Sequence, residues 1–197
     1  MKIATSLYPI EWHKDFESYL LKISTWVEAA VETGADLLVF PEYVGVEAAL
    51  LGTPETQSAS RDWIEAASAT WSETGQPWSE LAETHNVMIL AGTGPCRTDE
   101  GFVNQARLFA PGFGYGSQNK LTLTPWERDH TILAPGNTRN VFNTRFGRLA
   151  VNVCYDAEFP EHARSQETDL LLVPACTDSQ AGAERLRIAA KARALEN

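Results

Sequence analysis

The chain has 197 residues, of which 44% are hydrophobic and 21% are charged, and this composition is typical of a globular protein with one sizeable core. Its net charge of −10 and its lack of Lys/Arg-rich runs argue against nucleic acid or an anionic membrane as partners. Three cysteines without CxxC spacing, and an N-terminus without the apolar core of a signal peptide, favour the reducing cytoplasm. We therefore expect a single domain over residues 1–197, in the cytoplasm and outside the membrane.

Strand and helix patterns alternate in the first half of the chain. Apolar residues at helical spacing predict a helix over residues 16–33, with Gly34 as its C-cap. Continuous apolar runs predict strands buried on both faces at residues 37–40 and 86–94. The pattern also predicts a strand over residues 2–8 and a helical region over residues 57–85, broken near Thr74, Gly75 and Pro77.

Paired strands come next, and the helix–strand alternation then resumes. Residues 102–110 and 115–120 are predicted to form a hairpin around the glycine-rich stretch 112–116, and residues 138–142 and 148–153 to pair around Gly147. The last predicted elements are a helix at 160–166, a buried strand at 170–173 and a helix at 183–195. This order predicts a layered α/β fold with mixed sheets.

Polar side chains follow three of these strands. Glu42 comes just after one buried strand, Lys120 ends the hairpin, and Cys154 ends the strand before a Phe-Pro-Glu helix start. Sites in layered α/β folds are commonly built beyond the carboxyl ends of strands. Each residue also has a purely structural interpretation: a solvated acid, a surface lysine and a buried small thiol.

Taken together, the three side chains predict acyl-transfer chemistry. A thiol nucleophile needs a base, and a buried carboxylate with a raised pKa can act as one. An ammonium group and a backbone N–H can stabilise the negative oxygen of a tetrahedral intermediate. Glu42, Lys120 and Cys154 would then form a covalent hydrolytic site that uses no histidine.

Several motifs resemble those of the nitrilase superfamily, the carbon–nitrogen hydrolases, in order and in approximate spacing. They are FPE at 40–42, NK at 119–120, CYDAEFPE at 154–161 and ARALEN at 192–197, with MKIA at the start resembling the first strand of the family. The resemblance covers essentially the whole chain. It implies a four-layer α-β-β-α sandwich in which the C-terminal strands are missing, so that the isolated chain is expected to be poorly stable and weakly active.

The resemblance also implies roles for particular residues. Glu42 is expected to be the general base, Lys120 the oxyanion stabiliser and Cys154 the nucleophile, with the backbone N–H of Tyr155 completing the oxyanion hole. Glu127 is the candidate for a second glutamate that many family members carry, the alternative being a solvated loop acid. Tyr43 and Tyr155 are pocket candidates, with core packing as the alternative.

The CYDAEFPE motif is similar to the amidase-like branches, which implies hydrolysis of an amide to ammonia or an amine and a carboxylic acid. Nitrile or N-carbamoyl hydrolysis is the alternative within the superfamily, and a catalytically inactive structural or binding relative is another. No cofactor or metal is expected, the partner is a small amide or nitrile, and the full-length form is expected to be a homo-oligomer.

Two interpretations from outside this family remain open. A Cys–His hydrolase would use one of the four histidines, His13, His85, His130 or His162, none of which lies in a motif. A nucleotide-binding module would use the glycine-rich stretches at 92–95 and 112–116, but neither has phosphate-loop spacing.

Overall fold

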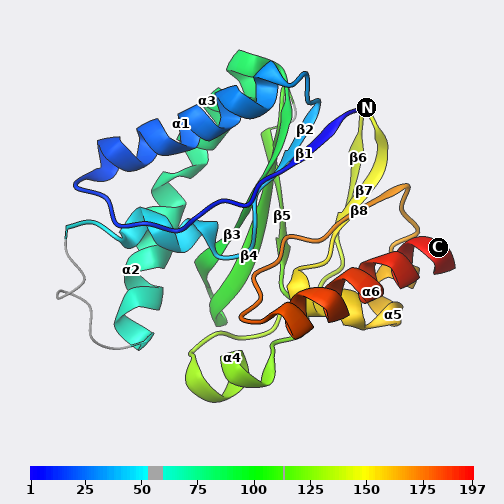
Figure 1. Ribbon diagram of the computed structural model, residues 1–197. Coiled ribbons are helices and arrows are strands. Elements are labelled where there is room, and N and C mark those ends of the chain that lie inside the picture. Colours follow the sequence, from blue (N-terminus) through cyan, green and yellow to red (C-terminus); the bar gives the residue numbers. More distant parts are fainter. Residues whose placement is uncertain (53–59, 113) are drawn as a thin grey trace.

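A computed structural model describes residues 1–52, 60–112 and 114–197. Their strands form a five-stranded sheet of order β1-β2-β3-β4-β5 and a three-stranded sheet of order β6-β7-β8 (Figure 1). The strands are β1 Ile3–Thr5, β2 Leu37–Val39, β3 Met88–Thr98, β4 Gly101–Ala110, β5 Gly114–Asn119, β6 Val141–Thr144, β7 Gly147–Val151 and β8 Leu170–Leu172. The helices are α1 Phe16–Glu32, α2 Ser60–Glu73, α3 Gly75–His85, α4 Pro125–His130, α5 Pro160–Arg164 and α6 Gln180–Glu196, with 3₁₀ turns η1 Val44–Ala49 and η3 Cys154–Glu158.

Both sheets contain parallel and antiparallel pairs. In the five-stranded sheet β1, β2 and β3 are parallel, whereas β4 and β5 join as antiparallel strands. In the three-stranded sheet β7 is antiparallel to β6 and parallel to β8. The expected α/β class with mixed sheets is therefore confirmed.

Helix α1 shows how local sequence sets the boundaries of an element. Asp15 caps its start by accepting a hydrogen bond from the backbone N–H of Ser18 at 2.9 Å. At the other end Gly34 takes a left-handed φ of 78° and donates its N–H to the carbonyl of Val31 at 2.8 Å. The helix thus ends where the sequence predicts, and its buried residue Ile23 lies against the sheet.

Two apolar clusters hold the layers together. The first joins α1 and α3 to one face of the five-stranded sheet and includes Tyr19, Ile23, Val27, Leu38, Phe40, Trp78 and Ile89. The second fills the space between the two sheets and includes Leu37, Met88, Leu90, Leu108, Phe142, Leu149, Val151 and Leu172. Burial of these side chains at about 25 cal/mol per Å² is the main force that holds the sheets face to face. Helices α5 and α6 lie beside the three-stranded sheet, away from α1 and α3 (Figure 1).

Several elements differ in extent from the sequence predictions. Strand β3 continues past Gly92 and Gly94 to Thr98, because a bulge between Leu90 and Thr93 lets the ladder resume along β4. The opening strand is shorter than the predicted range of residues 2–8, because β1 ends at Thr5. The helical region does break at Thr74, as expected, while residues 57–59 of that prediction and Phe113 of the predicted turn lie outside the described residues.

Candidate active site

The three predicted side chains meet at one cavity, which residues of α4, η3 and α6 also line. Glu42 follows β2, Lys120 follows β5 directly and Cys154 begins η3 after β7. The cavity has a volume of about 750 Å³, within the range of small-molecule sites. Its lining includes Glu42, Tyr43, Lys120, Trp126, Glu127, Cys154, Tyr155, Glu158, Cys176, Asp178 and Arg185. Every site residue that the sequence predicted therefore lies at this cavity.

The carboxylate of Glu42 is 2% exposed and fully engaged in hydrogen bonds. Its Oε1 accepts from Lys120 Nζ at 2.8 Å and from Asn104 Nδ2 at 3.0 Å, and its Oε2 accepts from the backbone N–H of Cys176 at 3.1 Å. Burial raises the pKa of Glu42 above its usual value, although the charge of Lys120 acts in the opposite direction. Such a carboxylate is a stronger base than a solvated one.

Lys120 is almost completely buried and lies between two carboxylates. Its Nζ is 2.8 Å from Glu42 Oε1 and 2.8 Å from Glu127 Oε2. Burial by itself lowers the pKa of Lys120, but the two carboxylates outweigh that effect and raise the pKa above its ordinary value. The lysine therefore stays a cation at neutral pH.

Glu127 is buried rather than solvated, which excludes the loop-acid alternative. A capping box holds it at the start of α4: Thr124 Oγ1 accepts from the N–H of Glu127 at 3.2 Å, and Glu127 Oε2 accepts from the N–H of Thr124 at 2.8 Å. The hydroxyl of Tyr43 also donates to Glu127. Burial raises the pKa of Glu127, but Lys120 and these hydrogen bonds together lower it below its usual value, so the carboxylate is ionised.

Cys154 occupies a strained position at the turn. Its φ of 49° is in the left-handed region, which costs a non-glycine residue about 1–2 kcal/mol. Its N–H donates to the carbonyl of Pro174 at 2.9 Å, and its thiol donates to the carbonyl of Cys176 at 3.6 Å. Burial and the charge of Glu42 raise the pKa of Cys154 to about 12, so the resting thiol is protonated. The predicted helix start at Pro160 is confirmed, but the 3₁₀ turn η3, which begins at Cys154, precedes it.

Asp156 anchors this turn, and the sequence analysis missed it. Its carboxylate accepts from the N–H groups of Leu121, Thr122 and Val153 at distances between 2.7 and 3.1 Å. Burial raises the pKa of Asp156 to about 6 although these donors lower it, so the group is mainly ionised at neutral pH. Its place two residues after Cys154, in a motif, was the only signal in the sequence.

Asn104 is a second residue that the sequence analysis missed. It is fully buried in β4 and donates to Glu42. An amide in a mostly apolar strand was the available signal. Trp126, Glu158 and Arg185 carried no signal, because only the fold brings α4, η3 and α6 to the same cavity.

Histidines are not found among the described residues that line this cavity. His13 contacts the buried Glu47 at 2.9 Å, and His162 contacts Thr122 and Arg139. Neither is placed to act on Cys154. Among the described residues, no group of three His, Cys, Asp or Glu side chains is arranged to hold a metal ion, and no helix is long and apolar enough to cross a bilayer.

Comparison with known proteins identifies the family. The family model described as carbon–nitrogen hydrolase matches residues 2–197. The chain therefore belongs to the carbon–nitrogen hydrolase family, the nitrilase superfamily.

Curated relatives are longer than this chain. A probable hydrolase, YhcX, of Bacillus subtilis is 29% identical over 200 residues, which are 100% of this chain and 38% of the relative. A deaminated glutathione amidase of Synechocystis is 32% identical over 188 residues, 87% of this chain and 65% of the relative. The chain thus spans between about two fifths and two thirds of the length of these proteins.

The fold is also similar to that of a solved amidase from Nesterenkonia sp. AN1. The TM-score is 0.71 at 24% identity, covering 100% of this chain and 75% of the amidase chain. That structure is of a glutamate-to-glutamine variant and shows the result of Michael addition of acrylamide at its active-site cysteine.

Proposed function

We propose that the protein is an amidase-like hydrolase that cleaves non-peptide carbon–nitrogen bonds through a cysteine acyl-enzyme. The observation that carries the proposal is the geometry around Glu42: a buried carboxylate that binds Lys120 at 2.8 Å and accepts from the N–H of Cys176, whose carbonyl in turn accepts from the Cys154 thiol. The reaction class fits the names of the relatives, which include deaminated glutathione amidase.

In the first step Glu42 takes the proton of the Cys154 thiol as the sulfur attacks the amide carbon. A raised pKa on the base makes this transfer easier, and the thiol with its pKa of about 12 needs such a base. Negative charge then forms on the amide oxygen. The ammonium of Lys120 and the N–H of Tyr155 are the proposed donors to that oxygen.

Collapse of the tetrahedral intermediate breaks the carbon–nitrogen bond, and the leaving nitrogen takes the proton held by Glu42. Water then attacks the thioester, with Glu42 as base again, and releases the carboxylic acid and the free thiol. Glu127 is a positioning residue in this scheme, because it fixes Lys120 and keeps it charged.

Hydrolysis of amides, of nitriles and of N-carbamoyl compounds begins in each case with attack of the thiolate on a carbon atom. The motif that follows Cys154 favours amides as the substrates. We further propose that the complete protein has the α-β-β-α sandwich with additional strands, and that it forms a homo-oligomer. The expectation that the 197-residue chain is poorly stable and weakly active stays a prediction.

Release of ammonia from a panel of small amides, nitriles and N-carbamoyl compounds tests the proposal. The purified protein is compared with its Cys154→Ala variant and with Cys176→Ala, which removes the thiol of the exposed cysteine near the same cavity. We expect release from amides that Cys154→Ala abolishes and Cys176→Ala leaves within about threefold, since only the first carries the bond-forming step.

Three outcomes would contradict the proposal. Turnover that survives in Cys154→Ala would exclude the covalent route. Turnover that Glu42→Gln leaves intact while a histidine substitution abolishes it would favour a Cys–His hydrolase. If no compound turns over, iodoacetamide labelling of Cys154 no faster than that of Cys96 would indicate a catalytically inactive relative.

A further inference from the structure

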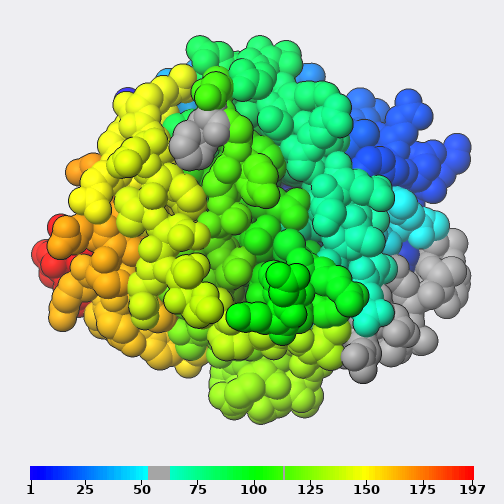
Figure 2. All heavy atoms as spheres, turned by 180° about the vertical axis from the view of Figure 1, so that it is seen from behind, coloured from blue at the N-terminus to red at the C-terminus, as the bar shows by residue number. Residues whose placement is uncertain are grey.

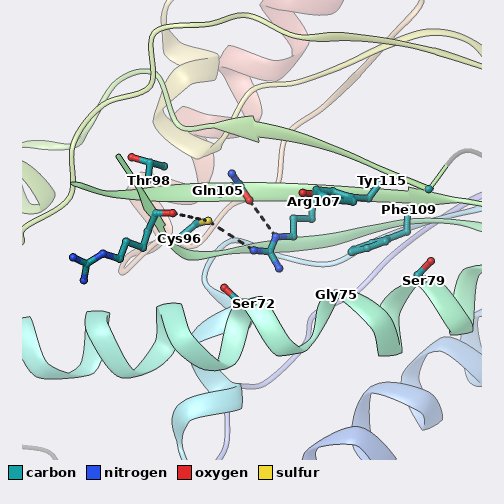
Figure 3. Close-up of a pocket in the computed structure, with 11 residues that line it drawn as sticks. Ser72, Gly75, Ser79, Cys96, Thr98, Gln105, Arg107, Phe109 and Tyr115 are labelled. Carbon is teal, nitrogen blue, oxygen red and sulfur yellow. Dashed lines mark hydrogen bonds between the residues drawn. The ribbon is translucent and has the colours of Figure 1, made fainter. Parts of the chain in front are cut away.

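A second cavity lies away from the candidate active site, between the α2–α3 helix pair and strands β3, β4 and β5 (Figure 3). Its volume is about 480 Å³. Figure 2 shows this side of the molecule, where β4 and β5 are visible between the α2–α3 helices and the β6–β7 hairpin. The cavity shares no lining residue with the one at Cys154.

Arg107 is the central side chain of this cavity. It extends from β4 toward the helices (Figure 3) and is only 8% exposed. Its Nε donates to Gln105 Oε1 at 3.1 Å, its Nη1 donates to the carbonyl of Trp71, and its Nη2 lies 3.8 Å from Cys96 Sγ. The guanidinium also lies 4.7 Å from the centroid of the Trp71 ring.

These contacts position the guanidinium but do not neutralise it. Within the part of the chain that the structure describes, Arg107 forms no ion pair with a carboxylate. A buried cation is normally paired with an anion, because burial removes the water that would stabilise its charge. Two of its five N–H groups have no partner among these contacts.

The other described residues that line the cavity carry no negative charge. No aspartate or glutamate is among the described lining residues, although the chain as a whole carries a net charge of −10. Arg97 also borders the cavity, although its guanidinium lies over the ring of Phe102, 5.5 Å from the centroid, and Ser72 and Ser79 supply hydroxyl groups from the helices. A basic cavity in an acidic protein attracts anions selectively.

One wall of the cavity is aromatic. The rings of Phe109 and Tyr115 lie with their centroids 6.0 Å apart and their planes at 32°, and Tyr115 is 62% exposed. Flat unsaturated groups pack well against such a pair. The planar fork of a guanidinium matches a carboxylate.

We propose that this cavity is a binding site for a small aromatic carboxylate, whose carboxylate group pairs with Arg107 and whose ring packs on Phe109 and Tyr115. The site is separate from the hydrolytic centre, and the proposal does not rest on the proposed function.

Titration calorimetry with benzoate tests the site, with benzyl alcohol as the uncharged control and inorganic phosphate as a non-aromatic anion. Arg107→Gln is expected to weaken benzoate binding by about 20-fold or more, since it removes charge-assisted hydrogen bonds. Arg97→Gln removes the same charge from an exposed side chain that lies over Phe102, and it is expected to weaken binding by less than about threefold. Equal effects of the two substitutions, or phosphate binding as tightly as benzoate, would overturn the proposal.

Cys96 provides a local test in the unmutated protein, in case Arg107→Gln fails to fold. Benzoate at about ten times its dissociation constant is expected to slow iodoacetamide labelling of Cys96 by about tenfold. Labelling of the exposed Cys176, measured on its own peptide by mass spectrometry, is the internal reference. No detectable benzoate binding, or binding that leaves Cys96 labelling unchanged, would overturn the proposal.

Discussion

Asp156 and Thr122 are joined by a hydrogen bond of 2.7 Å from the Thr122 N–H to the Asp156 carboxylate. Asp156 lies in the turn of Cys154, and Thr122 lies in the loop that follows Lys120. The bond therefore connects the proposed nucleophile to the proposed oxyanion stabiliser through the backbone.

Asp156→Asn is expected to lower the free energy of unfolding by about 3 kcal/mol, because an amide cannot accept from all the buried N–H groups that the carboxylate now satisfies. Urea denaturation measures the loss. Asp129→Asn removes the same charge from an exposed position and is expected to change stability by less than about 0.5 kcal/mol. Similar losses of stability in the two variants would show that the removed charge, rather than the hydrogen bonds of Asp156 to the backbone, is responsible.

The kcat/KM for a reactive amide is expected to rise with pH through the pKa of Glu42. Glu42 acts in its deprotonated form, and burial raises its pKa, so the acid limb should have its midpoint above 4.5. No fall is expected up to about pH 9, because Lys120 has a raised pKa and the thiol titrates at about 12. An acid limb below pH 4.5 would contradict the role of Glu42.

Glu127→Gln is expected to lower kcat by about 100-fold, the usual magnitude when an oxyanion donor is misplaced. Removing one of the two carboxylates should also lower the pKa of Lys120, so the alkaline limb of the kcat profile should move to lower pH. A merely structural role would not move that limb. Glu158→Gln is the control: it lines the same cavity but pairs with Arg185, and kcat should stay within about threefold.

Gly92→Ala is expected to destabilise the protein by about 3 kcal/mol and to reduce activity. Gly92 has a φ of 70°, and a Cβ there would lie 2.1 Å from the carbonyl oxygen of Pro41, so the segment that carries Glu42 would have to move. Gly34→Ala has a similar φ of 78° with nothing within 4 Å of the added Cβ, and its expected cost is about 1 kcal/mol. Thermal unfolding of both variants separates the effect of the clash from that of the backbone strain. Equal losses of stability in the two variants would contradict the predicted clash with Pro41.

Local sequence patterns were sufficient for most of the elements. Helix α1 begins and ends where its apolar spacing and Gly34 predict, and the short strands at Leu37 and Leu170 follow from continuous apolar runs. The hairpin of β4 and β5 follows from alternation and glycine. These features depend on interactions between residues that are close in the chain, so a sequence contains them directly.

Features that depend on contacts between residues distant in the sequence were less predictable. The extension of β3 to Thr98 depends on a bulge, and the bulge depends on the partner strand β4. The turn η3 between Cys154 and α5 is held by Asp156, whose partner Thr122 is distant in sequence. No local pattern encodes such a pair.

Most of the elements, the family and the candidate residues Glu42, Lys120 and Cys154 could be predicted from the sequence, because their motifs are short and contiguous. The burial of Glu127 against Lys120, and the lack of a carboxylate partner for Arg107 among the described residues, could be seen only in the folded structure. Both results depend on burial and charge across segments far apart in the chain. Those quantities arise only when the sheets and helices pack together.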